Sequence, residues 1–145
     1  MRAGEVCTRE VYLTGPGRAL AEAAQEMRRR HVGTLVVVKP AGKEVRPVGI
    51  LTDRDIVCGQ LARGADLHCL TVGDVMSTDL TTVGEDDDVA AVIAQLAKAG
   101  VRRAPVVNTK GDLVGIVSLD DLLPVLSEQL AGLARLIGMQ SRAER

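Results

Sequence analysis

One short pattern occurs twice in this chain of 145 residues, and the repetition constrains the fold more than any other feature. VGILTDRDI begins at Val48 and VGIVSLDDL begins at Val114, each with a glycine and apolar residues before a hydroxyl, and an aspartate three positions further on. Earlier parts of the two halves align at an offset of 69 positions, which falls to 66 at the repeated pattern. A chain repeated in this way is expected to fold as two equivalent units.

Both halves have the same predicted order of elements. A short strand (11–14 and 80–83) precedes a segment with apolar residues at helical spacing (20–27 and 89–96). Two strands follow (34–38 and 47–51; 104–107 and 113–117), and a helix begins at the repeated pattern. The prediction is an α+β fold of two tandem β-α-β-β-α repeats, divided into residues 1–66 and 67–145. Because a three-stranded half of about 65 residues is marginal alone, the sheets should pack together about a pseudo-twofold axis.

Three short segments have simpler interpretations as turns or helix starts. The acidic GEDDD sequence at 84–88 is typical of a helix start, where carboxylates meet free N–H groups. NTKGD at 108–112 predicts a hairpin turn, and KPAGKEVRP at 39–47 predicts a longer turn that holds the three additional residues of the first half.

Composition excludes several classes of partner. The net charge is −1 and there is no Trp or Phe, with Tyr12 the one aromatic residue, so neither the charge nor the stacking groups for nucleic acid are present. We expect no membrane partner, since no uninterrupted apolar run nears the ~18 residues of a span. The three cysteines lack the spacing of a metal site, and the chain is expected in the cytoplasm with its thiols reduced.

The last predicted helix, from about Leu119 to Met139, carries more apolar side chains than one small half needs. Large apolar patches are uncommon on monomers, so part of this helix is expected to face a second subunit. The sequence therefore predicts a homodimer. The apolar residues of this helix are Leu122, Leu123, Leu126, Leu130, Leu133, Leu136 and Ile137.

With these features the sequence resembles the CBS-domain pair, also called a Bateman module, over almost its whole length. The resemblance rests on DVMSTDLTTV at 74–83 and GVRRAPVVNTKGDLVGIVSLDDLL at 100–123, and in the first half on HVGTLVVV and VGILTDRDI. It departs from the family at EVCTREVYLTGPG (5–17), which replaces the usual Asp-Val-Met opening. The resemblance implies clefts between the two repeats that bind adenosine-containing ligands: AMP, ADP, ATP or S-adenosylmethionine.

The repeated pattern has chemistry suited to a ribose. A hydroxyl at a strand end can cap the next helix and face a ligand, and an aspartate three residues later lies on the same side. Its carboxylate can accept bonds from both ribose hydroxyls. Two ribose clamps are therefore predicted, Thr52 with Asp55 and Ser118 with Asp121, and Gly49 and Gly115 leave space for a ligand or a backbone. The alternative is an ordinary helix capping box, which uses the same residue types.

Basic residues near these positions could hold phosphate. Arg102 and Arg103 stand where relatives that bind phosphorylated ligands often carry basic residues, and their first-half counterparts are Gly33 and Thr34. Arg54 adds a cation to the first junction, although each of the three could also be a solvated surface charge. The two clefts are therefore not expected to be equivalent.

These features predict a regulatory module that senses an adenosine-containing ligand and signals to a separate, unidentified effector protein. No obligatory cofactor, metal site or catalytic motif is expected, so the chain is not predicted to be an enzyme. The main alternative is an interaction module that has lost its ligand and acts by dimerising or docking through the last helix. A protein that responds to oxidation through its cysteines ranks lower.

Overall fold

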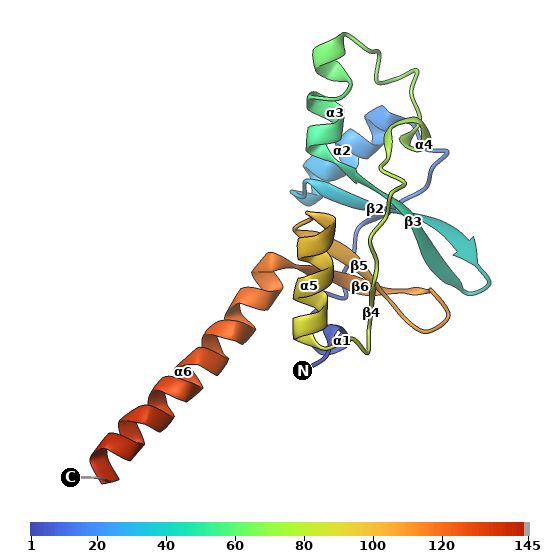
Figure 1. Ribbon diagram of the computed structural model, residues 1–145. Helices are drawn as coiled ribbons and strands as arrows, with labels where there is room; N and C mark the ends of the chain where they lie inside the picture. Colours follow the sequence, from blue (N-terminus) through green and yellow to red (C-terminus); the bar gives the residue numbers. More distant parts are fainter. Residues whose placement is uncertain (144–145) are drawn as a thin grey trace.

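Two three-stranded sheets form the body of the protein in a computed structural model that describes residues 1–143 (Figure 1). The first sheet has the order β1 (Leu13–Thr14), β2 (Thr34–Ala41) and β3 (Glu44–Thr52). The second has the same order with β4 (Val83–Gly84), β5 (Arg103–Val107) and β6 (Leu113–Ser118). In each sheet the short strand pairs parallel to the middle strand, and the last two strands are antiparallel. The predicted repeat is confirmed.

Helices follow the strands in equivalent places. α2 (Leu20–Arg30) and α5 (Val89–Ala99) are both 11 residues long, and α3 (Asp53–Val57) and α6 (Leu119–Ala143) both begin at the repeated pattern. Asp88, in the predicted acidic helix start, caps α5 by accepting a bond from the Ala91 amide at 2.8 Å. The sequence pattern did not predict three short helical segments, α1 (Ala3–Val6), α4 (Val72–Val75) and a 3₁₀ turn at Leu61–Arg63.

Each repeat has its own aliphatic core, as expected of a chain with one aromatic residue. Leu20, Leu35 and Leu51 are fully buried in the first, and Val92, Val106 and Val117 in the second. At the C-terminal end of α2, His31 adopts the left-handed conformation with φ 55°, and Gly100 has φ 67° at the equivalent end of α5. The two repeats therefore close their first long helix in the same way with different residues.

The leading segment of each repeat packs on the other repeat. The first leading segment, residues 1–9, contains α1, and Ala3 is fully buried in the core of the second repeat. The second leading segment, residues 71–77, contains α4, and Val72 is fully buried in the core of the first repeat. The amides of Gly4 and Gly73 donate to the carbonyls of Glu85 and Pro16, at equivalent places of the opposite repeat. The boundary predicted between residues 66 and 67 divides the chain, but the two cores exchange these segments.

The first hairpin is longer than the sequence indicated. Much of 39–47, predicted as a turn, is strand, because β2 and β3 stay paired as far as Ala41 with Glu44. The turn itself is Gly42 and Lys43, and Gly42 has φ 66°, the conformation that glycine adopts most readily. The three additional residues therefore lengthen the hairpin. At its edge Arg46 pairs with the buried Asp112 of the second repeat, Nε to Oδ1 3.2 Å.

α6 projects from the body and lies apart from both sheets over most of its length (Figure 1). Leu122 is its one fully buried apolar residue within the described part of the chain, and its exposed apolar residues extend to Met139. By length and composition alone this helix could cross a membrane, an outcome not anticipated from the sequence, because isolated charges such as Glu128 and Arg135 interrupt its apolar runs.

Candidate functional site

A cleft of about 740 Å³ lies between the two repeats. It brings together the end of β3 and the start of α3, the starts of β2 and β5, and the chain that leads into β4. Five of the predicted site residues line it, although they come from both halves of the sequence. They are Thr52, Arg54, Asp55, Arg102 and Arg103.

The first junction forms a complete capping box at the start of α3. The Thr52 hydroxyl accepts from the Asp55 amide at 3.2 Å, and Asp55 Oδ2 accepts from the Thr52 amide at 2.9 Å. The capping box is therefore formed, yet polar atoms at the cleft can still make hydrogen bonds to a ligand. The Thr52 hydroxyl still has its proton to donate, and Asp55 Oδ1 has no bond assigned within the described chain. Capping and ligand binding are compatible here.

Arginines supply one wall of the cleft. Arg102 and Arg103 lie at the start of β5, both exposed, and Arg54 follows the first junction on α3. Arg103 reaches across to the first repeat, where its Nη1 donates to the Thr34 hydroxyl at 3.0 Å. The lining also has three carboxylates, Asp53, Asp55 and Asp79. Positive and negative groups are therefore both available, as a ligand with a ribose and a phosphate requires.

Apolar side chains occupy the remaining lining. Ile50, Leu80 and Val101 contribute aliphatic surface from three elements. Tyr12, the one aromatic side chain, is not among the lining residues. It packs against the first core and has the Arg30 guanidinium 5.3 Å from its ring centroid. A flat base in this cleft would lie against aliphatic groups.

Gly49 and Gly115 do not line the cleft, and both lie beneath a leading segment. A Cβ at Gly49 would lie 2.8 Å from the Ser77 carbonyl oxygen and 2.8 Å from Met76 Sδ. A Cβ at Gly115 would lie 2.7 Å from the Thr8 carbonyl oxygen and 2.8 Å from Cys7 Sγ. The space predicted at these glycines is taken by the backbone of the exchanged segments, which leaves their predicted ligand contact a hypothesis.

The second junction differs from the first in how its carboxylate is used. Asp121 Oδ2 accepts from the Ser118 amide at 2.9 Å and from the Ser118 hydroxyl at 3.1 Å. Asp121 Oδ1 accepts from the Thr8 hydroxyl of the first leading segment at 3.3 Å. Both oxygens therefore have partners within the chain, and neither Ser118 nor Asp121 lines the 740 Å³ cleft. The ribose clamp predicted here stays a prediction.

Several lining residues were not anticipated. Ser77, Asp79 and Thr81 enter the cleft from the segment that leads into β4, and Gly33 and Thr34 from the start of β2. The offset of 69 aligned Gly33 and Thr34 with Arg102 and Arg103. The fold places both of these equivalent pairs at one cleft, which the alignment alone did not indicate. No pattern in the sequence indicated that the polar residues at 77–81 would line the cleft.

The four groups with a shifted pKa lie outside the cleft. Burial is the main reason that the pKa of the Cys7 thiol is raised, and a hydrogen bond to Asp66 raises the pKa of Cys69. The pKa of Asp66 is lowered mainly by the His68 amide. Asp74, which accepts from the backbone and side chain of Thr71 at the start of α4, also has a lowered pKa. Within residues 1–143 no three side chains of the metal-ligating types gather.

Comparisons with known proteins agree with this architecture. The family model described as CBS domain matches twice, over residues 3–59 and 72–128. The crystal structure of hypoxic response protein I with two coordinated zinc ions is 31% identical, with a TM-score of 0.73 over 86% of this chain and 98% of that one. The CBS domain protein PAE2072 from Pyrobaculum aerophilum, complexed with AMP, is 26% identical with a TM-score of 0.73, covering 83% and 89%.

A curated relative shows that the family extends to longer chains. An uncharacterized protein from Methanopyrus kandleri is 34% identical over 122 residues, which are 84% of this chain and 61% of the relative. This chain therefore spans less than two thirds of that relative's length. The two family-model matches, the repeated sheets and the cleft between them establish that the chain belongs to the CBS domain family.

Proposed function

We propose that this protein is a regulatory module that binds an adenosine-containing ligand in the cleft between its repeats. The observation that carries the proposal is the convergence of Thr52 and Asp55 with Arg102 and Arg103 around one 740 Å³ space. The AMP complex of PAE2072, a protein of the same fold, supports this ligand class. AMP, ADP, ATP and S-adenosylmethionine are the candidates, and the function is binding and regulation rather than catalysis.

The lining divides into three chemical zones that match the parts of a nucleotide. Thr52 and Asp55 can donate to and accept from ribose hydroxyls, and Ile50 and Val101 can cover a base. The guanidiniums of Arg102, Arg103 and Arg54 can pair with phosphate through several N–H donors each. The proposed site is the first junction, because one oxygen of its carboxylate has no hydrogen bond to residues 1–143.

The Arg103 contact gives a route from binding to signalling. Arg103 belongs to the second repeat and donates to Thr34 of the first, so a phosphate that pairs with Arg103 competes with a contact between the repeats. Ligand binding then shifts the packing of the repeats to the extent that the ligand prefers one arrangement. The output goes to a separate effector protein. We place the module in the cytoplasm, in agreement with its three free cysteines.

A ligand panel tests the proposal. Thermal unfolding is followed by circular dichroism with AMP, ADP, ATP, S-adenosylmethionine, GTP and NAD in turn, because the chain has no Trp to report. A ligand at 100 times its Kd stabilises the fold by about 2.7 kcal/mol. We expect one adenosine compound to do so, and Asp55→Asn to weaken its binding at least tenfold by isothermal titration. Asp121→Asn is the matched control, expected to retain binding.

Loss of binding in Asp121→Asn with full binding in Asp55→Asn would move the site to the second junction. Absence of binding by every compound, in protein shown to be free of carried-over ligand, would overturn the ligand proposal.

The second candidate is an interaction module, which the exposed apolar side chains of α6 favour. We also propose that the chain forms a homodimer. Truncation after Leu126 separates the two functions, because it removes most of α6 and leaves the lining of the cleft intact. Ligand binding that survives the truncation while self-association is lost would show that the two are separate properties of the chain.

A further inference from the structure

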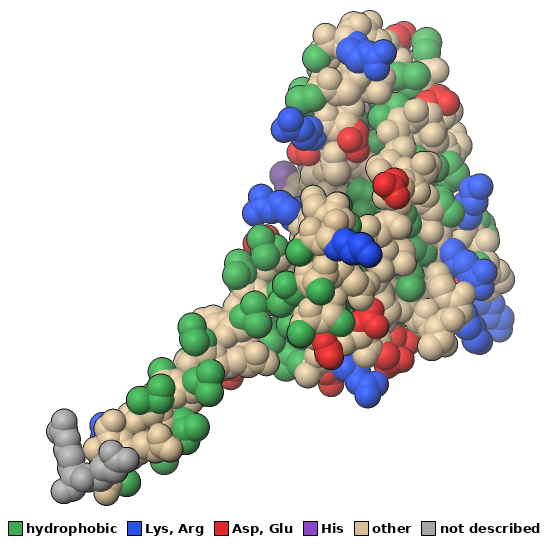
Figure 2. Space-filling view, in the orientation of Figure 1, with side chains coloured by type: hydrophobic (Ala, Val, Ile, Leu, Met, Phe, Trp, Pro, Cys, Tyr) green, Lys and Arg blue, Asp and Glu red, His purple; other side chains and the backbone are tan. Residues whose placement is uncertain are grey.

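α6 exposes more apolar surface than a monomer of this size ordinarily keeps. Its exposed apolar side chains run along the projecting helix in Figure 2, and Leu130 and Ile137 are 69% and 64% exposed. Together they expose on the order of 800 Å², about the area that one partner contributes to a standard interface. They are Leu119, Leu123, Leu126, Leu130, Leu133, Leu136, Ile137 and Met139.

The apolar residues of α6 follow a heptad repeat. Starting at Leu119, the spacings alternate between four and three residues, which places one apolar side chain on the same stripe at every step as far as Ile137. This is the a/d pattern by which helices pack side by side. The a/d stripe consists of Leu119, Leu123, Leu126, Leu130, Leu133 and Ile137.

Four of the five charged residues in the described part of α6 follow the same repeat. Asp121, Glu128, Arg135 and Arg142 are each seven residues apart, so all four lie on one stripe, at the f positions opposite the a/d stripe. Of the e positions beside the a/d stripe, Asp120 at the base of the helix is charged, whereas Ser127, Ala134 and Ser141 are small and uncharged. A span buried in lipid would place Glu128 and Arg135 in the hydrocarbon, which is unfavourable. The pattern favours another helix as the partner.

The a/d stripe fits an antiparallel pair of helices. An antiparallel pair centred between Ala131 and Gly132 brings Leu130 level with the partner's Leu133, and Leu126 level with the partner's Ile137. The charged f positions face away from the partner helix in this register, so their charges stay in water when the a/d stripe is buried. Antiparallel helices also align their dipoles favourably.

The surface beside α6 can receive the tip of a partner helix. Two apolar hollows of about 250 and 180 Å³ lie between α5 and the base of α6, lined in part by Ile93, Leu122 and Leu126. The outer face of α5 is rich in small residues, with Ala90, Ala94 and Ala97 exposed. In the antiparallel register the partner's Met139 lies at about the level of Leu123, near these hollows.

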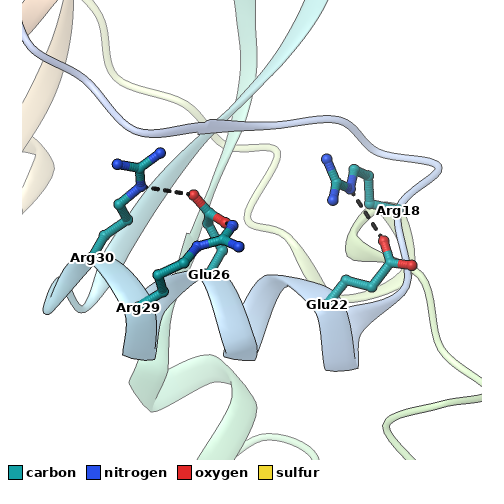
Figure 3. Close-up of polar contacts among 5 residues, drawn as sticks. All are labelled: Arg18, Glu22, Glu26, Arg29 and Arg30. Atoms are coloured by element: carbon teal, nitrogen blue, oxygen red, sulfur yellow. Dashed lines mark hydrogen bonds and ion pairs between the residues drawn. The ribbon is translucent and has the colours of Figure 1, made fainter.

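α2, the helix of the first repeat that corresponds to α5, has an exposed side that is unsuited to such a contact. The exposed side of α2 carries ion pairs, Arg18 with Glu22 and Glu26 with both Arg29 and Arg30 (Figure 3). Burying these groups in an interface would cost their hydration. The apolar contact surface is therefore confined to the second repeat.

We propose that two copies of this chain associate through α6, whose a/d stripe pairs antiparallel with that of the second copy while each tip reaches the α5–α6 hollows of the other. This deepens the homodimer proposed above and does not depend on a ligand. Each body lies at the tip of the partner's helix. The 180 Å³ hollow shares Val101 and Arg102 with the 740 Å³ cleft, so the partner's tip comes close to one edge of that cleft.

The first experiment measures the mass of the full chain by sedimentation equilibrium without nucleotide. We expect a dimer, and expect the double variant Leu130→Glu/Leu133→Glu to weaken dimerisation by roughly 100-fold or more, because both residues lie at the centre of the stripe. Ala131→Glu is the matched control, since it adds a carboxylate one position away, outside the stripe, and should stay dimeric. Both side chains changed in the double variant are exposed in the monomer, so its circular dichroism spectrum should stay that of a folded body.

Disulfide formation tests the orientation, in a Cys58→Ser/Cys69→Ser background. Leu126→Cys combined with Ile137→Cys should cross-link two chains on oxidation, because these positions lie level in the antiparallel pair. Ile137→Cys alone should not, since the two copies of residue 137 would be about 16 Å apart along the axis.

Three outcomes would overturn the proposal. The first is a wild-type chain that is monomeric at about 50 µM, a concentration at which even weak dimers form. The second is a Leu130→Glu/Leu133→Glu variant that remains dimeric. Ile137→Cys alone could cross-link as well as the double variant, which would indicate parallel helices. Co-flotation of a monomer with phosphatidylcholine–phosphatidylglycerol vesicles would instead assign α6 to a membrane.

Discussion

The two junctions begin with the same pattern, yet among residues 1–143 the carboxylate of the first has one oxygen without a partner and that of the second has none. One carboxylate oxygen of Asp55 accepts the bond that caps α3, whereas Asp121 accepts from Ser118 through one oxygen and from Thr8 through the other. The residue equivalent to Thr8 in the second leading segment is Ser77, which lines the cleft, and the structure assigns its hydroxyl no bond to Asp55. A motif can thus be repeated for folding while its capacity to bind is set by the segment that packs over it.

The largest change in the free energy of unfolding is expected from substitutions at Gly49 and Gly115, on which the two leading segments lie. Gly49→Val and Gly115→Val each place side-chain atoms against a backbone carbonyl oxygen that a Cβ would already approach to 2.8 and 2.7 Å. We expect each to lower the free energy of unfolding by about 1–3 kcal/mol. Thermal and urea unfolding measure this, and Gly138→Ala on α6, where nothing lies within 4 Å of the added Cβ, is the control. An effect in one glycine variant and not the other would break the equivalence of the two segments.

A smaller change in the free energy of unfolding is expected from the hydroxyls of Thr8 and Ser77, which occupy equivalent positions near the two junctions. Thr8→Val removes the donor to Asp121, and we expect it to lower the free energy of unfolding by about 1 kcal/mol. Ser77→Ala removes a hydroxyl that is not bonded to Asp55 and should change stability little without ligand. Urea unfolding of both variants measures the difference. Equal losses in the two variants would show that the junctions are engaged alike.

The ends of α2 and α5 give a test of backbone conformation. His31 has φ 55° where the second repeat has Gly100 at φ 67°, and glycine adopts this conformation at less cost. His31→Gly should therefore stabilise the protein by up to about 1 kcal/mol, and Gly100→Ala should destabilise it by a similar amount. Melting temperatures measured in parallel decide the signs, and a destabilised His31→Gly variant would contradict the argument.

The smallest expected effect concerns cysteine reactivity. The pKa of Cys69 is raised by its hydrogen bond to Asp66, and that of Cys7 mainly by burial. Because the thiolate is the reactive form, Asp66→Asn should increase the rate of Cys69 alkylation severalfold at pH 8 and leave Cys7 unchanged. Mass spectrometry after brief iodoacetamide treatment measures both rates. Unchanged Cys69 reactivity in this variant would assign its raised pKa to another cause.

Much of the fold could be predicted because hydrophobic periodicity and the repeated pattern are local signals. They located both sheets, α2, α5 and the start of α6 at Leu119. They could not show that Ala3 is buried in the second repeat and Val72 in the first. A helix of four residues has too few positions for a period, and no local signal states which sheet it will contact.

The site was predictable to the extent that it depends on residue type. Thr52, Asp55, Arg102 and Arg103 were proposed from their chemistry, and the fold brings them into one cleft. The different environment of Asp121 could not be predicted, because it depends on Thr8, which is 113 residues away in the sequence. Gly49 and Gly115 show the same limit: close approach was anticipated, but its source was not.

The exchange of leading segments has a consequence for how the protein is made. Residues 1–9 leave the ribosome long before Val117 and Leu122, which belong to the core that buries Ala3. The first leading segment must therefore wait, unpacked, until the second repeat has emerged. Since contacts so distant in sequence form slowly, maturation should end with the closing of this segment, and an interrupted translation product would lack a finished second repeat.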